Sequence, residues 1–349
     1  MSNYPLSICI PSKRNLEQSK ASISSAIGFC DSTGSELVIS DSSGVSNKEE
    51  MWKKIPLPFM KYIKSDSKKN SNWRDNWYKG IENCSGKFIG VVSDDDIIVN
   101  LDDSIIDYKE IDHSEIAGIK PLISLWSSSA GIYKINKFNI DGNTALERVK
   151  QYQILAAGNN TTYYSFYKNN ILKDIYSLLQ HHPTKGGYID WSITLTCVAA
   201  GKVLVDASKL LIYKNNNWFG SQEFINKQAC KLYEDCGLGD LGYLMSPLLN
   251  ALDVFILIMR KKSELALDEK LEAAEYMLDY NLQLFIRNCS HHNEFNTNEL
   301  FKKINTKDNI ENKLNKSLAI IESKFSNTLA NKYKLFYENA LEVKWGDFC

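Results

Sequence analysis

Three consecutive aspartates, Asp94, Asp95 and Asp96, follow a short apolar run at residues 88–92. The run predicts a buried strand, and a strand that ends in clustered carboxylates places negative charge at the carboxyl edge of a sheet, where open α/β sheets bind ligands. Neighbouring carboxylates repel one another, and a divalent cation that links them to a phosphate would relieve that repulsion. The alternative is an acidic turn in solvent.

A fourth carboxylate stands apart from these three in the sequence. Asp190 follows the flexible pair Gly186-Gly187 and begins a predicted helix that runs to about residue 200. A helix N-terminus favours the ionised form of a carboxyl group, which suits a base that must be unprotonated near neutral pH. The alternative is that Asp190 only caps this helix.

The elements that must position the aspartates alternate between strands and helices over the first hundred residues. Apolar runs predict strands at residues 6–10, 36–39 and 87–93, with a short strand at 62–63. Asn15 is a candidate N-cap for the helix after the first strand, and apolar side chains four residues apart predict a helix at 72–83. This alternation indicates an α/β fold, with a largely parallel sheet flanked by helices.

The remaining chain divides into a mixed middle part and a helical end. In the middle part, we expect strands at 116–126 and 161–167, helices at 144–157 and 170–179, and a strand pair at 202–206 and 209–213. From about residue 221 we expect only helices, at 222–235, 246–260, 268–288, 297–304 and 308–342. The shift predicts two domains, residues 1–220 and 221–349.

The order of several short segments resembles the GT-A fold glycosyltransferases, and within them family 2, over residues 5–220. Residues 6–14 resemble the "IPTxNR" turn, and residues 37–44 resemble the "VVDDGS" segment. Residues 72–80 resemble the "ARNxG" helix. Residues 85–96 resemble the "GxYIxFLDxDD" metal motif, and residues 189–191 resemble the "EDW" motif. Asn217, Trp218 and Ser221 resemble a loop that covers the diphosphate in that family. The resemblance therefore implies a GT-A domain, a Rossmann-like mixed sheet flanked by helices, with an α-helical C-terminal region.

The resemblance also assigns roles to individual residues. It implies that the nucleotide site is formed by Pro11, Lys13, Arg14, Asp41, Arg74, Asp94 and Asp95. It implies that Asp96, with Asp94 directly or through water, holds Mn²⁺ or Mg²⁺, and that Asp190 is the catalytic base. Alternatives from the residues alone are that Asp41 forms an Asx turn and that Arg74 is a surface charge.

These roles imply an inverting, metal-dependent glycosyltransferase in surface polysaccharide synthesis. Its substrates would be a nucleotide-diphosphate sugar and a saccharide or lipid-linked acceptor. One alternative is a sugar-phosphate nucleotidyltransferase, but that activity would favour a glycine-rich loop after the first strand, and residues 11–14 contain no glycine. The other is a non-catalytic nucleotide-sugar-binding or scaffold protein of a polysaccharide-assembly complex.

Composition excludes some classes of partner. The 349 residues include 41 basic and 42 acidic residues, so no excess of positive charge favours nucleic acid as a partner. The eight cysteines show no Cys-x-x-Cys spacing and are expected to be reduced. The N-terminus leads directly into a predicted strand, so we expect no signal peptide and a cytoplasmic location.

The C-terminal helices leave three roles open: acceptor binding, packing of a homodimer, or peripheral contact with the inner face of the cytoplasmic membrane. An apolar helical face runs from Leu248 to Met259 and is followed by three basic residues. That pattern is typical of an interfacial helix or of a buried one. The apolar stretch at 251–259 contains Asp253 and is too short to span a bilayer.

Overall fold

The computed structural model describes residues 4–65, 73–103, 106–111, 115–184, 187–239, 241–290, 305 and 307–347 of the chain. The chain forms two compact units: the first contains residues 1–143, 151–177 and 201–221, and the second contains residues 144–150, 178–200 and 222–349. The second unit therefore includes the helical region expected from residue 221 together with two earlier segments.

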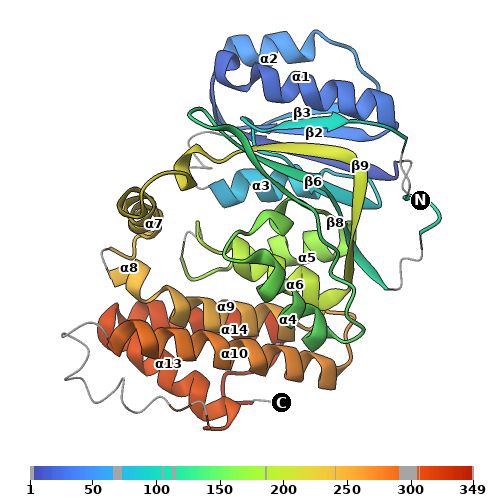
Figure 1. The fold of residues 1–349 in the computed structure, drawn as a ribbon. Helices are drawn as coiled ribbons and strands as arrows, with labels where there is room; N and C mark the ends of the chain where they lie inside the picture. Colours follow the sequence, from blue (N-terminus) through green and yellow to red (C-terminus); the bar gives the residue numbers. More distant parts are fainter. Residues whose placement is uncertain are drawn as a thin grey trace. The chain divides into compact units, whose positions relative to one another are not determined.

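The first unit is built around one nine-stranded mixed sheet (Figure 1). The strand order is β3-β2-β1-β4-β8-β6-β9-β5, with β7 paired to β6. The strands are β1 (Leu6–Ser12), β2 (Glu36–Asp41), β3 (Met60–Lys64), β4 (Phe88–Val91), β5 (Ile97–Asn100), β6 (Ile116–Ser127), β7 (Gly131–Asn136), β8 (Phe166–Lys168) and β9 (Lys202–Lys214). Strands β1 to β4 are parallel to one another, and β8 pairs antiparallel with β4. The predicted α/β class is confirmed.

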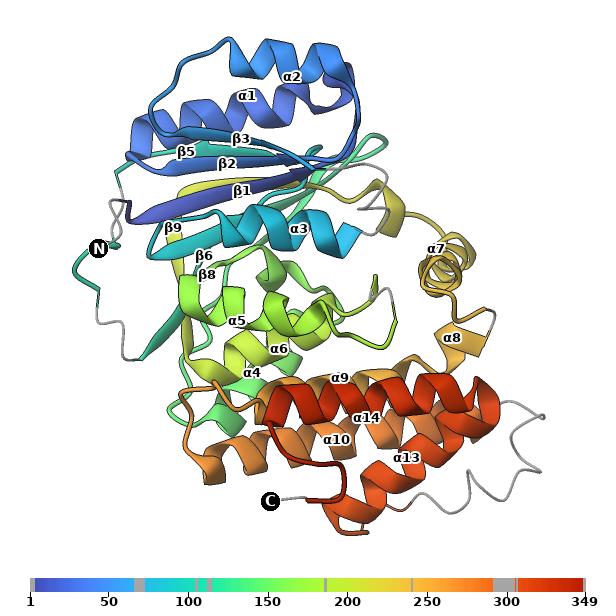
Figure 2. The ribbon, with the colours of Figure 1, turned by 180° about the vertical axis from the view of Figure 1, so that it is seen from behind.

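Helices cover both faces of this sheet. Figures 1 and 2 show α1 (Leu16–Thr33) and α2 (Ser46–Lys53) on one face and α3 (Trp73–Glu82) on the other. Asn15 caps α1 as predicted, because its side chain accepts a hydrogen bond from the backbone N–H of Gln18 at 3.0 Å. The parallel register brings Ser12, at the end of β1, opposite Asp41, at the end of β2. The carboxyl ends of the strands thus meet at one edge.

Two predicted strand regions are wrong in detail. Residues 161–167 were expected to be a strand, but Thr161–Tyr164 form a 3₁₀ helix and only the short β8 follows. The expected strand pair at 202–206 and 209–213 is the single strand β9. Its pairing with β6 is irregular, and the Asp206 carboxylate accepts a hydrogen bond from the backbone N–H of Ser208 at 3.0 Å. The polar residues here are typical of a turn, but the chain does not reverse its direction.

The sequence analysis also missed three elements of the first unit. They are α2, β5 and β7. In α2, the only buried side chains are Lys48 and Trp52, so no apolar stripe indicates a helix. β5 is four residues long and β7 is largely exposed, so neither has a continuous apolar signal.

Among the described residues, the second unit is built from helices and the segments between them. The helices are α6 (Asp190–Ala200), α7 (Gln222–Asp235), α8 (Leu241–Leu244), α9 (Ser246–Met259), α10 (Leu267–Ser290), α13 (Ile310–Lys324) and α14 (Asn327–Leu341). Two further described helices are α4 (Ala145–Ala156) and α5 (Asn169–Leu179). The helix expected at 308–342 is interrupted between α13 and α14, where the Ser326 hydroxyl accepts a hydrogen bond from Leu329 N–H at 3.1 Å and caps α14. The helix expected at 297–304 lies outside the described residues.

Helix α9 is a core helix. Its apolar residues from Leu248 to Met259 are all buried, and α6, α10 and α14 pack against it. The alternative in which this helix lies on a membrane is therefore wrong, because no apolar face is left to contact lipid. Among the residues that the structure describes, no helix combines the length and the apolar character needed to cross a bilayer.

Candidate functional site

Asp94 ties the end of β1 to the turn after β4. Its Oδ2 atom accepts hydrogen bonds from the Ser12 hydroxyl at 2.6 Å and from the backbone N–H groups of Lys13 and Arg14, each at 2.9 Å. Its Oδ1 atom is paired with Nη1 of Arg14. Although burial opposes ionisation, these donors hold the pKa of the Asp94 carboxyl below its ordinary value. Asp94 is therefore a carboxylate whose two oxygens are both occupied by protein donors.

Arg14 links two of the three aspartates. Its Nη2 atom lies 2.8 Å from Oδ2 of Asp95, while its Nη1 atom contacts Asp94. Burial and the neighbouring charge of Asp94 raise the pKa of Asp95, and Arg14 opposes that rise. The guanidinium is 41 % exposed, so it can exchange these partners for an anionic ligand.

Asp96 differs from Asp94 because, among the described residues, only one of its two carboxylate oxygens accepts a hydrogen bond. It is fully buried, and its Oδ1 atom accepts a hydrogen bond from the backbone N–H of Lys214 at 2.8 Å. Its Oδ2 atom has no hydrogen-bond partner among the described residues. Burial, with a smaller contribution from the charge of Asp95, raises the pKa of Asp96 to about 7 against the Lys214 hydrogen bond. The alternative of an acidic turn in solvent is wrong, since Asp94 and Asp96 are buried.

The unpartnered oxygen of Asp96 has the chemistry of a cation ligand. Mg²⁺ and Mn²⁺ prefer carboxylate oxygens, and Mg²⁺ is commonly bound by one or two carboxylates together with substrate phosphates. Among the described residues, no cluster of three or more His, Cys, Asp or Glu side chains could hold a metal by itself. The residues present thus fit a cation that shares its ligands with a bound phosphate, and they do not form a metal cage made of protein alone.

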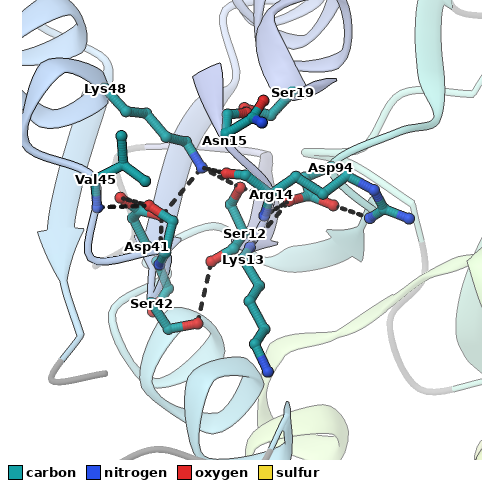
Figure 3. A network of polar contacts seen from close by, with 12 residues as sticks. Ser12, Lys13, Arg14, Asn15, Ser19, Asp41, Ser42, Val45, Lys48 and Asp94 are labelled. Atoms are coloured by element: carbon teal, nitrogen blue, oxygen red, sulfur yellow. Dashed lines mark hydrogen bonds and ion pairs between the residues drawn. The ribbon is translucent and has the colours of Figure 1, made fainter. Parts of the chain in front are cut away.

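Lys48 is the central cation of the network drawn in Figure 3, and the sequence analysis did not single it out. Its Nζ atom lies 2.6 Å from the Ser12 hydroxyl, 2.8 Å from the Arg14 carbonyl oxygen and 3.0 Å from Oδ1 of Asp41. The side chain is fully buried. A weak signal existed, because Lys48 is one helical turn from the buried Trp52 and so shares the inward face of α2.

Asp41 is held by four donors at the end of β2. Besides Lys48, they are the Tyr62 hydroxyl at 2.5 Å and the backbone N–H and side-chain hydroxyl of Ser43, at 3.1 and 3.0 Å. The Ser43 N–H bond is the Asx turn that the sequence left as an alternative. Burial and the hydrogen bond to Asp41 raise the pKa of Tyr62 well above its ordinary value. Asp41 therefore organises the ends of β2 and β3.

Asn76, which the sequence analysis also missed, links α3 to the same edge of the sheet. Its Nδ2 atom donates to the Ser12 carbonyl oxygen at 3.2 Å, and its Oδ1 atom accepts from the Ser40 hydroxyl at 2.8 Å. Arg74 stands two residues earlier, in the first turn of α3. Burial lowers the pKa of its guanidinium, with Asp75 opposing. Arg74 is thus a partly buried cation rather than the surface charge considered above.

Pro11 and Lys13 flank Ser12 at the end of β1. Pro11 is a buried strand residue opposite Ser40. Lys13 enters the network only through its backbone N–H, and its side chain extends away from the other residues in Figure 3. Of the expected nucleotide-site residues, the Arg14 side chain therefore contacts those of Asp94 and Asp95 directly. Asp41 is connected to this network through Lys48.

The loop after β9 lies next in sequence to the Lys214 amide that contacts Asp96. The Asn215 side chain donates to the Tyr133 hydroxyl at 2.5 Å, and Asn216 Oδ1 accepts from the Ser128 N–H at 2.8 Å. Trp218 remains exposed at 38 %. The loop that the resemblance compares with a diphosphate cover is therefore anchored at its start and presents one aromatic ring to solvent.

Asp190 belongs to the second unit and is the first residue of α6, as predicted. Its carbonyl oxygen accepts a hydrogen bond from the Thr194 hydroxyl at 2.8 Å. The side chain is half-buried, and its charge contributes to the raised pKa of Tyr233, which burial dominates. The carboxylate therefore stands at a helix N-terminus, where the ionised form is favoured.

Comparisons with known proteins give structural neighbours only. No family model matches the chain, and no curated protein matches it. Among solved structures, the chain is similar to S. aureus TarS 1-349, with 12 % identity over 95 % of this chain and 90 % of that chain and a TM-score of 0.43. The complex of TarS 1-349 with UDP-GlcNAc gives 13 % identity, 97 % and 90 % coverage and a TM-score of 0.48. S. aureus TarS gives 15 % identity, 97 % and 55 % coverage and a TM-score of 0.42.

Proposed function

We propose that this protein transfers a sugar from a nucleoside diphosphate sugar to a saccharide or lipid-linked acceptor, with inversion and with Mn²⁺ or Mg²⁺ bound. The observation that carries the proposal is the buried Asp96 carboxylate, whose Oδ2 atom accepts no hydrogen bond from the described residues. A buried carboxylate oxygen that accepts no hydrogen bond destabilises the fold. A ligand that contacts this oxygen explains why it is there.

The donor diphosphate is assigned to the edge formed by β1 and β4. The cation would neutralise the charge that develops on the leaving diphosphate, with Asp96 as its protein ligand. The four hydrogen bonds to Asp94 favour a contribution through a metal-bound water, and they hold the backbone of Lys13 and Arg14 in place. Arg14 and Asp95 complete this part of the site by contacting phosphate and sugar oxygens.

The nucleoside is assigned to the ends of β1 and β2. Pro11 provides a rigid apolar edge there, and Asp41, fixed by Lys48 and Tyr62, offers carboxylate oxygens to a base N–H. Arg74 supplies a second cation for the phosphates from α3. A bound cation would also offset the repulsion between the aspartates and the anionic diphosphate.

Asp190 is proposed to take the proton from the acceptor hydroxyl. A base that activates the acceptor while the diphosphate leaves from the other side produces direct displacement and inversion at the anomeric carbon. A carboxylate at a helix N-terminus is suited to this role because the helix dipole keeps it ionised. The leaving diphosphate needs no separate acid when its charge is neutralised by cations.

The proposal is tested by measuring release of nucleoside diphosphate from a panel of nucleotide sugars, in Mn²⁺, in Mg²⁺ and in a chelator. We expect turnover with one donor class that the chelator abolishes and that Asp96→Asn and Asp190→Asn each reduce by about 100-fold or more. Asp31→Asn, an exposed change on α1, is the matched control. Nucleotide binding without turnover would favour the scaffold alternative, and release of pyrophosphate from a nucleoside triphosphate would favour the nucleotidyltransferase.

A further inference from the structure

A buried polar cluster lies inside the second unit, apart from the residues assigned above. Nε2 of His182 lies 3.0 Å from Oδ1 of Asp253, and neither side chain is exposed to solvent. His182 precedes the segment that leads to Asp190, whereas Asp253 is in the middle of the core helix α9. Burial of this polar pair against a largely apolar helix destabilises the fold unless the two side chains are well hydrogen-bonded.

Both nitrogens of the His182 ring are engaged. The N–H of Thr184 lies 3.3 Å from Nδ1, and Thr184 Oγ1 lies 3.2 Å from the same atom. The carbonyl oxygen of Thr184 also lies 3.4 Å from Nδ1. The ring is therefore held in one orientation, with Thr184 on one side and Asp253 of α9 on the other.

The segment is held a second time at Tyr188. The Thr184 hydroxyl donates to the Tyr188 hydroxyl at 3.3 Å, and the Tyr188 hydroxyl lies 3.4 Å from the hydroxyl of Tyr333 in α14. The Tyr188 ring stacks on Tyr233 of α7, with ring centroids 4.7 Å apart. The Gly187 N–H donates to the sulfur of Cys236 at 3.1 Å. Three C-terminal helices and the residue after α7 thus hold the described residues of this segment: His182, Thr184, Gly187 and Tyr188.

Asp190 begins α6 two residues after Tyr188, a distance of at most about 7 Å along the chain. Ile189, between them, is fully buried and its carbonyl oxygen accepts the N–H of Ile193 at 3.0 Å. The fixed points at His182 and Tyr188 therefore determine where α6 starts. Apolar packing alone would leave the start of a helix free to shift, because hydrophobic contacts are not directional.

We infer that the C-terminal helices act as a clamp for Asp190: the cluster of His182, Asp253, Tyr188 and Tyr333 fixes Tyr188, two residues before Asp190, and His182 and Asp253 are positioning residues for it. This inference rests on the proposed function, in which Asp190 is the base. It gives the helical region a role in catalysis that requires neither an acceptor nor a membrane to contact it.

The test uses the full chain with two kinds of variant. The first combines His182→Phe with Asp253→Leu, which replaces the polar pair by apolar side chains of similar shape and so removes the directional link with little loss of packing. The second is Tyr333→Phe, with Tyr337→Phe as its matched control. Both tyrosines are buried in α14, but the Tyr337 hydroxyl contacts the backbone of Asp347 instead of the cluster.

Four quantities are measured: turnover of the nucleotide sugar, Kd of the nucleoside diphosphate, hydrogen exchange of the amides at 187–194, and Tm. We expect the double variant to lose about 100-fold in turnover. Its amide exchange should be faster, whereas its nucleotide Kd and its Tm should stay near those of the native chain. Tyr333→Phe should show the same pattern more weakly, and Tyr337→Phe should show none of it.

The inference is overturned by unchanged turnover and exchange in both variants, by loss of nucleotide binding together with turnover, or by an equal effect of Tyr337→Phe. Should the double variant not fold, the two tyrosine variants decide between these outcomes. Should the native chain bind nucleotide without turnover, the proposed function fails, and the exchange rates alone decide whether the cluster fixes the start of α6.

Discussion

Asp94 and Asp96 lie two residues apart in one turn, yet the pKa of the first carboxyl group is lowered and that of the second is raised to about 7. Both are buried, so burial does not separate them. The difference is that Asp94 receives four protein donors, whereas one oxygen of Asp96 receives none from the part of the chain that the structure describes. Asp94 therefore serves the structure of the edge, and Asp96 remains available to a ligand.

The raised pKa of Asp96 predicts a specific dependence of stability on pH. In the unfolded chain this carboxyl titrates near 3.9, and in the folded protein near 7. The folded state holds the proton more tightly, so the stabilisation is complete below about pH 4, declines as the pH rises and is lost above 7, with a total of about 4 kcal/mol at most.

The variant that tests this dependence is Asp96→Asn. Urea unfolding without divalent metals, measured from pH 5 to pH 8, should show that the native chain loses stability relative to the variant as the pH rises. The comparison with the variant cancels the contributions of the other carboxyl groups. Parallel stability curves for the two proteins would contradict the assignment.

Lys48 should be the most important cation for the stability of the edge. Lys48→Met leaves the buried Asp41 without its ion-pair partner, and we expect the free energy of unfolding to fall by about 3–5 kcal/mol. Lys53→Met, on the same helix but in an exposed pair with Glu49, should cost less than about 1 kcal/mol. Equal losses in the two variants, measured by urea unfolding, would show that the Lys48 network adds nothing beyond a surface pair.

Arg14 should matter more for ligand binding than for stability. Because the Arg14 side chain is 41 % exposed and Asp94 keeps its other three hydrogen bonds, Arg14→Gln should lower the free energy of unfolding less than Lys48→Met does. Loss of charge-assisted hydrogen bonds to phosphate should weaken nucleotide binding by about 10- to 100-fold.

Arg14→Lys should restore only part of that affinity, since an ammonium group cannot bridge two oxygens in the way that the planar guanidinium does. Calorimetry measures the affinity, and thermal unfolding gives the stability. Arg14→Gln with native affinity would exclude the guanidinium from the site.

Features that depend on local sequence were predicted well. The strands at the N-terminus have continuous apolar runs, Asn15 caps α1 through its own side chain, and α6 starts at Asp190. Each depends on residues within about one turn of each other, so a single stretch of sequence contains the whole signal.

Features that depend on distant partners were not predicted. Lys48 is a buried cation only because Asp41, Ser12 and the Arg14 carbonyl surround it. The hydrogen bonds of Asn76 form only because α3 is placed beside β1. The pKa values of Asp94 and Asp96 depend on hydrogen-bond donors that lie about 80 and 118 residues away in the sequence, respectively. Such partners leave no periodic pattern in the sequence.

The central claim is that Asp96 takes part in a cation-dependent nucleotide site. It is tested most directly by calorimetric titration of nucleoside diphosphates and nucleotide sugars into the native chain and Asp96→Asn, at pH 8 and pH 6, with and without Mn²⁺. We expect the native chain to bind one nucleotide with Mn²⁺, more tightly at pH 8, because a protonated carboxyl cannot hold a metal. Asp96→Asn should lose the effect of Mn²⁺. Nucleotide binding that is equal in both proteins and independent of Mn²⁺ would contradict the claim.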